Sequence, residues 1–471
     1  MKAPSSASAV PWDALASNVE RLHLDSAVLR SAASDFGKRS LKQPAAVLVP
    51  RRVTDIEQAV HFCQKHSVPI GLRGAGHAAS QVALRQDGLI VDMRSLSKVI
   101  HVHAEQKWVD LEAGTRWGDL VKETLPHGLW PAISVDWMDL TVGGTISTGG
   151  IGAQSFREGL LTNQVEQIEI VTGEGRLTLC SRTSEPALFD AARGGLGLLG
   201  PIVRLRLRLA PAPTTLHLYS LYFPSLAEFL SAVDFLRISQ WVHSLFGLAI
   251  PTTRPPIGIR DTQFETLRNS AASTQTPHWM FRLDVGVFDG QEPALTHFVE
   301  LHKVVSRVQQ LSAEQFLFRT PPLMQDRRLS APPHPEMITF IPSESAPQIL
   351  SHSLSAVPPA AMGGGPVLII PISFSGCTTP MVDLPTSSHG FVFSLLRVGA
   401  SESMWTDDCD LATEQNLRLF EYAQSLGGVR YPVDALPLPA ITPKKRGLLK
   451  PLWDRFDPSG LFFPSELSMT R

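Results

Sequence analysis

Hydrophobic and polar positions change their spacing several times along the chain, and these changes mark the predicted elements. In the first half, short apolar runs predict strands at 45–49, 68–72, 89–93, 99–102, 108–111, 165–171 and 176–180. Helical spacing predicts helices over 12–33, over 55–66 with Thr54 as N-cap, and over 117–125. A strictly alternating strand follows at 203–209 and ends at Pro211-Ala-Pro213, where we expect the first domain boundary.

The second half combines longer helices with well-separated strands. Helices are predicted over 226–238 and 292–311, and strands over 279–287, 367–374 and 391–398. Both halves therefore indicate an α+β fold, and 471 residues are more than one hydrophobic core normally organises. The last apolar stretch, 449–464, is expected to dock back onto the body of the protein.

Composition excludes several classes of protein. An apolar content of 43% and a net charge of −2 are typical of a globular enzyme and give no argument for binding nucleic acid or an anionic membrane. Three alternating arginines at 204, 206 and 208 are expected on a solvated face. The four cysteines have no metal-ligand spacing and are expected to be reduced, and we expect no metal site. No apolar run is long enough for a signal peptide or a membrane span, so a cytoplasmic protein is the expectation.

The segment 134–151 carries the most chemical information. Asp136 precedes four glycines (143, 144, 149 and 150) and the hydroxyls of Thr141, Thr145 and Ser147. Glycines let backbone approach a bulky ligand, and hydroxyls and N–H groups bond to phosphate or heterocycle oxygens. A carboxylate beside such a cradle is a candidate general base. The alternative is a glycine-rich strand and turn with Asp136 at the surface.

A second glycine cluster lies upstream, at 74–79. Its sequence fits the G-x-G-x-x-A dinucleotide fingerprint, with Asp92 as a possible ribose partner. An NAD-binding Rossmann unit is disfavoured, because only nine residues separate the cluster from the next turn and strand. His77 sits inside this glycine turn, where neutral imidazole is either a nucleophile or a structural hydrogen-bonding group.

Together these motifs resemble the flavoprotein superfamily of vanillyl-alcohol oxidase and p-cresol methylhydroxylase, and within it the cytokinin dehydrogenases. The resemblance rests on Gly74-Ala-Gly-His-Ala78, Ser134-Val-Asp-Trp-Met-Asp-Leu-Thr-Val-Gly-Gly-Thr-Ile-Ser147, Val171-Thr-Gly-Glu-Gly175 and Leu188-Phe-Asp190 with Gly194-Gly-Leu-Gly197. It is dense over 34–210 and sparse afterwards, where His334-Pro335 and Phe456-Asp-Pro458 carry it.

The resemblance implies a fold and four segments. A lead-in helix over 1–33 would precede a PCMH-type FAD-binding domain of two subdomains over 34–212. An α+β substrate-binding cap would span 213–438, and residues 439–471 would return to the FAD domain.

The resemblance also implies a cofactor, a reaction and the residues that serve them. His77 would be linked covalently to the flavin of FAD. Asp136 would accept a proton from a secondary amine, such as an N6-substituted adenine, while hydride passes to flavin N5; the imine would hydrolyse to an amine and an aldehyde. Oxygen or a quinone-like compound would be the electron acceptor. The cofactor-binding residues implied are Gly74, Ala75, Gly76, His77, Ala78, Gln81, Asp136, Thr141, Gly144, Ser147, Ile202 and Tyr431.

Several positions depart from the family pattern. Ala75 and Ala78 replace an arginine and a serine, and Phe463-Pro-Ser-Glu466 replaces Ser-Pro-Gly-Gln. Phe246 stands where a substrate-binding glutamate is expected and cannot accept a hydrogen bond, which would cost on the order of 1–3 kcal/mol for an unpaired ligand donor. Adenine-type substrates are therefore in question. An FAD-dependent alcohol or sugar oxidase, and a non-catalytic ligand-binding relative, remain alternatives; no pattern specifies an oligomeric state.

Overall fold

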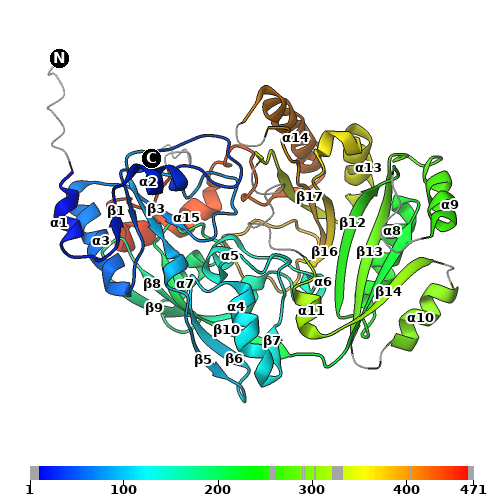
Figure 1. Cartoon of the computed structure of the whole chain (residues 1–471), viewed down its shortest axis with the longest axis horizontal. Coiled ribbons are helices and arrows are strands. Elements are labelled where there is room, and N and C mark those ends of the chain that lie inside the picture. The colour runs from blue at the N-terminus through cyan, green and yellow to red at the C-terminus, as the bar shows by residue number, and fades with distance from the viewer. Residues whose placement is uncertain are drawn as a thin grey trace.

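Three β-sheets with flanking helices build the protein, which confirms the α+β fold (Figure 1). The computed structural model describes residues 10–253, 260–288, 290, 292–301, 304–320, 332–401 and 405–464. The first nine residues, and Ser465 and Glu466 of the altered tail motif, lie outside this range.

The first sheet holds the upstream glycine cluster at one edge. Its order is β1 (Leu22–His23), β2 (Ala46–Leu48), β4 (Leu89–Asp92) and β3 (Ile70–Arg73). Both β2 and β3 pair with β4 in parallel, and helix α3 (Val53–His66) makes the crossover from β2 to β3. The loop that leaves the carboxyl end of β3 is residues 74–88, and it contains no helix. A Rossmann unit needs a helix there, so the NAD alternative is wrong.

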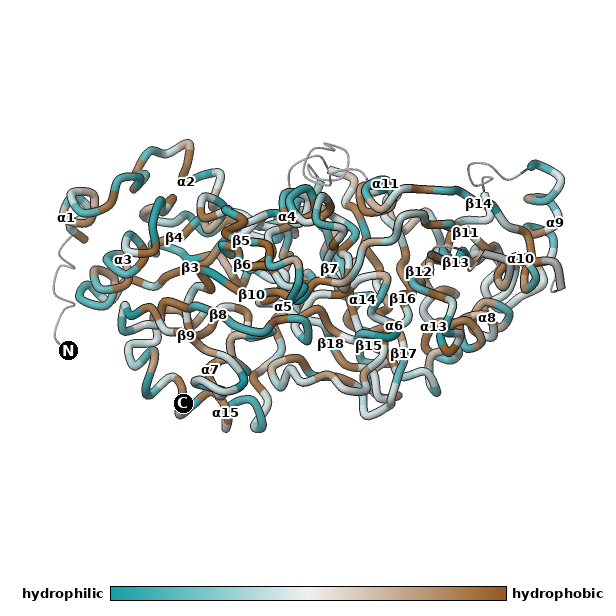
Figure 2. The backbone as a smooth tube through the Cα atoms, turned by 90° about the horizontal axis from the view of Figure 1, so that it is seen from below, coloured by the Kyte–Doolittle hydropathy of each residue, from teal (hydrophilic) through white to brown (hydrophobic). Residues whose placement is uncertain are grey.

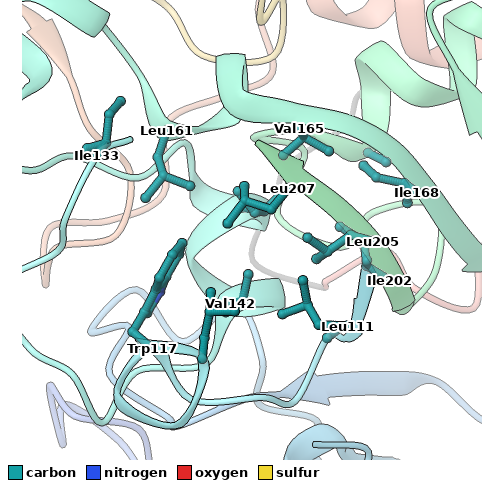
Figure 3. Packing of buried hydrophobic residues seen from close by; sticks show 14 of the residues in the cluster. Leu111, Trp117, Ile133, Val142, Leu161, Val165, Ile168, Ile202, Leu205 and Leu207 are labelled. Carbon is teal, nitrogen blue, oxygen red and sulfur yellow. The ribbon is translucent and has the colours of Figure 1, made fainter. Parts of the chain in front are cut away.

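The second sheet is antiparallel and carries the alternating arginines. Its order is β5 (Val99–His103), β6 (Trp108–Glu112), β10 (Ile202–Pro211), β8 (Val165–Val171) and β9 (Leu177–Ser181), and β7 (Leu129–Pro131) pairs with the end of β10. Arg204, Arg206 and Arg208 pair with carboxylates of neighbouring strands on the outer face. The leucines between them face α4 (Trp117–Thr124) and α5 (Val142–Thr148) in a close-packed core (Figure 3).

The third sheet has eight antiparallel strands at the opposite end of the molecule (Figure 1). Its order is β14 (Val305–Leu311), β11 (Leu216–Phe223), β13 (Trp279–Phe288), β12 (Ser244–Pro251), β16 (Val367–Ser373), β17 (His389–Leu395), β15 (Met337–Pro342) and β18 (Val429–Arg430). One face packs against the helices α8 (Leu226–Ile238), α10 (Glu292–Leu301), α13 (Ala346–Ala356) and α14 (Asp407–Ser425). Helix α9 (Asp261–Ala271) packs against Tyr222, Ile250 and Met280 on the other face. In Figure 2 hydrophobic stretches follow the strands through the interior, and hydrophilic stretches lie mostly on outer helices and loops.

Two sequence predictions of helices were wrong. The stretch 12–33 is broken into α1 (Trp12–Ala16), β1 and α2 (Ser26–Ala32), and the stretch 292–311 divides into α10 and the strand β14. In β14 the apolar residues Val305, Val308 and Leu311 are spaced three apart, which resembles helical spacing and conceals the strand. Pairing with β11 over its whole length decides in favour of the strand.

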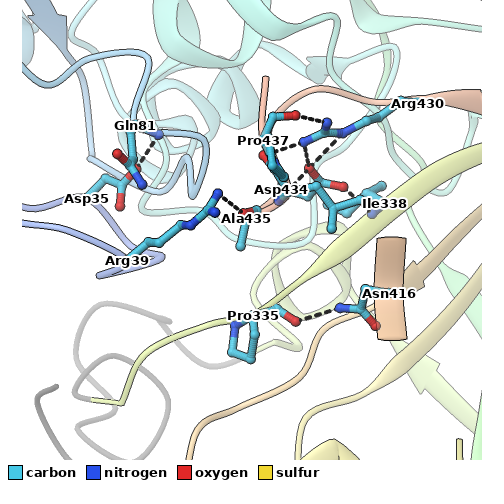
Figure 4. A network of polar contacts seen from close by, with 11 residues as sticks. Asp35, Arg39, Gln81, Pro335, Ile338, Asn416, Arg430, Asp434, Ala435 and Pro437 are labelled. Carbon is cyan, nitrogen blue, oxygen red and sulfur yellow. Dashed lines mark hydrogen bonds and ion pairs between the residues drawn. The ribbon is translucent and has the colours of Figure 1, made fainter. Parts of the chain in front are cut away.

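A polar network fixes the connection between the last strand and the last helix (Figure 4). Arg430 pairs with Asp434 and donates to the carbonyl of Leu436 at 2.6 Å, while the other oxygen of Asp434 accepts from the backbone N–H of Ile338 at 2.9 Å. Arg39 reaches from the N-terminal half to the carbonyl of Ala435 at 3.3 Å. The connecting segment is thereby held against both halves of the protein.

The C-terminal segment packs against the first two sheets. Helix α15 (Pro443–Phe456) packs beside α7 (Pro186–Ala192), at the N-terminal end of the molecule (Figure 1). Beyond it, the Leu461 carbonyl accepts from the N–H of Ile70 in β3 at 2.8 Å. Asp457 closes the turn, because its two oxygens accept from the N–H groups of Leu461 and Phe462 at 3.0 and 3.2 Å.

We expect Asp457→Ala to detach this tail. The substitution leaves two buried backbone N–H groups without an acceptor, which costs roughly 2–4 kcal/mol in the free energy of unfolding. Urea unfolding at neutral pH measures the change. Asp454→Ala is the matched control, because Asp454 lies three residues earlier and is exposed. Equal stability of the two variants would contradict a structural role for Asp457.

Candidate active site

A cavity of about 980 Å³ lies between the first two sheets and the inner face of the eight-stranded sheet. Its walls come from the loop after β3, the segment around α5, the turn before β10 and strands of the eight-stranded sheet. Of the predicted site residues, the cavity brings together Gly74, Ala75, Gly76, His77, Ala78, Asp136, Thr141, Gly144, Ser147, Ile202, Tyr431 and Phe246.

The loop after β3 and the start of α5 approach each other so closely that glycine is required. A Cβ atom at Gly74 would lie 2.3 Å from the hydroxyl oxygen of Thr141, and a Cβ at Gly144 would lie 2.8 Å from it. Gly76 has φ of +78°, in the left-handed region. The alternative interpretation of 134–151 as a strand and turn is wrong, since the segment forms α5 and Asp136 faces the cavity.

Gln81 is the one predicted site residue outside the cavity wall. Its backbone N–H donates to Asp35 at 2.7 Å (Figure 4). Its side-chain oxygen accepts from the hydroxyl of Ser40 at 2.9 Å. Asp35 itself lines the cavity, and burial raises its pKa to about 6. Gln81 therefore supports the glycine loop from behind.

His77 is held in an aromatic enclosure. Its ring lies 4.5 Å from the ring of Phe36 and 4.8 Å from that of Trp137, both in edge-on geometry. Burial, with a smaller contribution from His334, lowers the pKa of His77 to about 3. The imidazole is neutral at physiological pH, and its Nδ1 is buried without a hydrogen-bond partner.

Asp136 lines the cavity, and it is paired. Arg319, which follows α11 (Ala313–Leu317), donates from Nη2 to Asp136 Oδ1 at 2.7 Å. Burial raises the pKa of Asp136, and the charge of Asp284 acts in the same direction while the Arg319 guanidinium opposes both. Oδ2 accepts no hydrogen bond from the residues that the structure describes.

The eight-stranded sheet presents a polar half and an apolar half to the cavity. Across β14, β11, β13 and β12, one cross-strand row contains Arg307, Ser220, Asp284 and Phe246. Asp284 accepts from the hydroxyl of Ser220 at 2.6 Å and from Arg282 at 3.0 Å. The largely apolar half begins at β12 and contains one hydroxyl, that of Ser394, among Phe246, Leu248, Ile250, Leu368, Ile370, Val392, Leu396 and Ile338.

The sequence interpretation missed Arg319, Asp284 and Arg282. Arg282 and Asp284 did leave a signal, since they are the two charged residues of the otherwise apolar strand 279–288. Nothing around Arg319 marks it, because its partner Asp136 lies 183 positions away in the sequence.

The residues present fit FAD. The glycine cradle places backbone where side chains would clash. His77 lines the same cavity, and its buried Nδ1 has no hydrogen-bond partner among the residues that the structure describes. Gly150 and Thr148 of the α5 segment are tied to the hydroxyl of Tyr431, at 3.2 and 3.3 Å, so a residue of the C-terminal part closes this region.

Comparisons with known proteins support the binding of FAD. Residues 44–181 match the FAD binding domain family model. The uncharacterized oxidoreductase ORF5 in the fasciation locus of Rhodococcoides fascians is 29% identical over 427 residues, covering 88% of this chain and 90% of that protein. Cytokinin dehydrogenase 1 of Arabidopsis thaliana is 28% identical over 417 residues, covering 84% and 72%.

A solved structure is similar over nearly the whole chain. The crystal structure of 6-hydroxy-D-nicotine oxidase from Arthrobacter nicotinovorans has a TM-score of 0.71 at 16% identity, with 98% of each chain covered. This likeness supports the fold. Within the part of the chain that the structure describes, no helix combines the length and apolar character needed to cross a membrane.

Proposed function

We propose a reaction for this chain, an FAD-dependent oxidoreductase that is similar to the cytokinin dehydrogenases. The chain would oxidise a secondary amine at the carbon next to nitrogen. Bound FAD would supply the acceptor for a hydride. The resulting imine would hydrolyse to an amine and an aldehyde.

The placement of Asp136 is the observation that carries this proposal. Asp136 lines the same cavity as the glycine cradle, and Arg319 holds its Oδ1, which leaves Oδ2 as the oxygen for a substrate. A carboxylate enclosed in this way can accept the proton of a substrate N–H without competition from bulk water. Trp137 and Val135 flank it in the cavity wall and help to exclude solvent.

The two halves of the sheet indicate the shape of the substrate. A hydrocarbon substituent would lie against Phe246, Leu248 and Leu368, and a head group with hydrogen-bond donors would face Asp284. Phe246 and Asp284 are cross-strand partners, so a carboxylate stands beside the position where the sequence comparison expected a glutamate. An N6-substituted adenine with an apolar substituent thus regains an acceptor for its ring N–H, in contrast to the sequence expectation.

The apolar half also weighs against the sugar-oxidase alternative. A sugar would leave most of its hydroxyl groups against Leu248, Ile250, Leu368 and Ile370, whose side chains cannot accept hydrogen bonds, with the hydroxyl of Ser394 as the polar group beside Leu368. The non-catalytic alternative is disfavoured because the glycine cradle and the enclosed carboxylate of Asp136 line the same cavity.

Anaerobic mixing tests the proposal. The purified yellow protein should bleach at the flavin absorption band when isopentenyladenine or a related secondary amine is added, and simple alcohols and sugars should leave it oxidised. Bleaching by an alcohol or sugar, with none by any secondary amine, would replace the proposal with the alternative. Oxygen consumption compared with reduction of a quinone dye then identifies the electron acceptor.

A covalent bond between His77 and the flavin forms part of the proposal. The support is the buried Nδ1, which has no hydrogen-bond partner in a neutral ring lining the cavity. An alkylated nitrogen needs no such partner, so the bond would remove an unsatisfied polar atom from the interior.

A further inference from the structure

The ion pair between Asp136 and Arg319 joins two parts of the protein that are far apart in sequence. Asp136 precedes α5, and Arg319 follows the short helix α11 after the edge strand β14. Nη2 of Arg319 donates to Oδ1 of Asp136 at 2.7 Å, and both side chains are about four-fifths buried. A pair in this setting is screened little by solvent.

The guanidinium of Arg319 is fixed by its own segment before any substrate binds. Nη1 donates to the carbonyl of Phe316 at 2.8 Å, and the guanidinium carbon lies 4.3 Å from the centre of the Phe316 ring. Phe316 is fully buried in the core beside Trp130, with ring centres 6.1 Å apart. The cation is therefore held in place by packing against the sheet that supports α5.

Other charged and titratable groups face Asp136 from the elements packed around it. Asp284 and Arg282 project from β13 into the same cavity, and the negative charge of Asp284 opposes ionisation of Asp136. Among the described residues, the other charged or titratable groups that line the cavity are Asp35, Arg73, His77, Tyr222, Arg307, Glu336 and Tyr431. Arg319 is the cation in direct contact with the carboxylate, so it opposes both burial and Asp284.

We propose that Arg319 is the positioning residue of the base: it holds one oxygen of Asp136, keeps the group ionised, and leaves the other oxygen facing the substrate. This inference rests on the proposed function for its role in catalysis. It assigns a different role to each carboxylate oxygen: the guanidinium binds Oδ1, and Oδ2 takes the proton. Arg319 acts through Asp136 and does not need to touch the substrate.

Substitution of Arg319 tests the inference. Two titrations measure its effect: the pH dependence of the flavin reduction rate, and an infrared titration of the Asp136 carboxyl group. Removing the opposite charge at Arg319→Gln should raise the pKa of Asp136 by about 1–3 units. The acid limb of the flavin reduction rate, measured by stopped flow with a secondary amine, should move up by the same amount. Arg319→Lys keeps the charge and should recover part of the shift. Arg176→Gln, at a side chain that is 78% exposed, is the matched control and should leave both titrations unchanged.

An infrared titration of the purified flavoprotein separates this inference from the proposed function. The Asp136 carboxyl band is assigned by its loss in Asp136→Asn, and its titration should move upward in Arg319→Gln whether or not a substrate is known. An unmoved band would overturn the role of Arg319. If no secondary amine reduces the wild-type flavin, the reaction is wrong, but the infrared result still decides on Arg319. Arg319→Met, which keeps the packing on Phe316, gives the same test if the glutamine variant does not fold.

Discussion

Asp136→Asn is expected to lower the rate of flavin reduction by about 10²-fold or more, the usual scale for losing a general base. Asparagine fills the same space and can still bond to Arg319, but its amide cannot take a proton from the substrate nitrogen. Anaerobic stopped-flow reduction with a saturating secondary amine measures the effect on the chemical step. Flavin content should not change, because the backbone cradle at Gly74 and Gly76 is untouched.

The pH dependence of the flavin reduction rate should also distinguish Asp136→Asn from the wild type. Burial raises the pKa of Asp136, so protonation of the base should lower the wild-type rate as the pH falls through that raised value. This acid limb should disappear in Asp136→Asn. The control is Asp119→Asn on the exposed side of α4, which should reduce at the wild-type rate. A rate in Asp136→Asn equal to that of the control would remove Asp136 from the mechanism.

The parts of the site that are local in sequence could be predicted from the sequence. Gly74, Gly76 and His77 lie within four residues, and Asp136 to Ser147 within twelve, so turn chemistry and residue type are sufficient to find them. The strand–loop geometry of 70–78 follows from the same local rules. Roles assigned to these residues stay predictions until they are tested.

The wall contributed by the eight-stranded sheet could not be predicted in the same way. Whether Asp284 stands beside Phe246 depends on the register between β13 and β12, which no local pattern specifies. The contact between Arg319 and Asp136 joins residues 183 positions apart in the sequence. It depends on how α11 packs against the hydrophobic core beneath α5. Phe246 alone suggested a missing acceptor, and only the pairing of strands revealed Asp284.

His77→Ala is expected to abolish covalent attachment of the flavin completely. No other residue placed in the cavity wall combines a neutral nucleophilic nitrogen with a position in the glycine loop, among the residues that the structure describes. Acid precipitation measures the effect: the wild-type pellet should stay yellow, and the variant should release all of its colour to the supernatant. Before acid treatment the variant should still bind FAD, because backbone groups of Gly74, Ala75 and Gly76 form the cradle.

The control and the contrary outcome follow from the position of the ring. His127→Ala, at an exposed histidine after α4, should retain a fully yellow pellet. Because Nδ1 of His77 has no hydrogen-bond partner, the alanine variant leaves no donor or acceptor unsatisfied, and its cost in stability should be limited to lost packing against Phe36 and Trp137. A colourless wild-type pellet would show that the cofactor is held without a bond to His77, and the unpartnered nitrogen would then need another explanation.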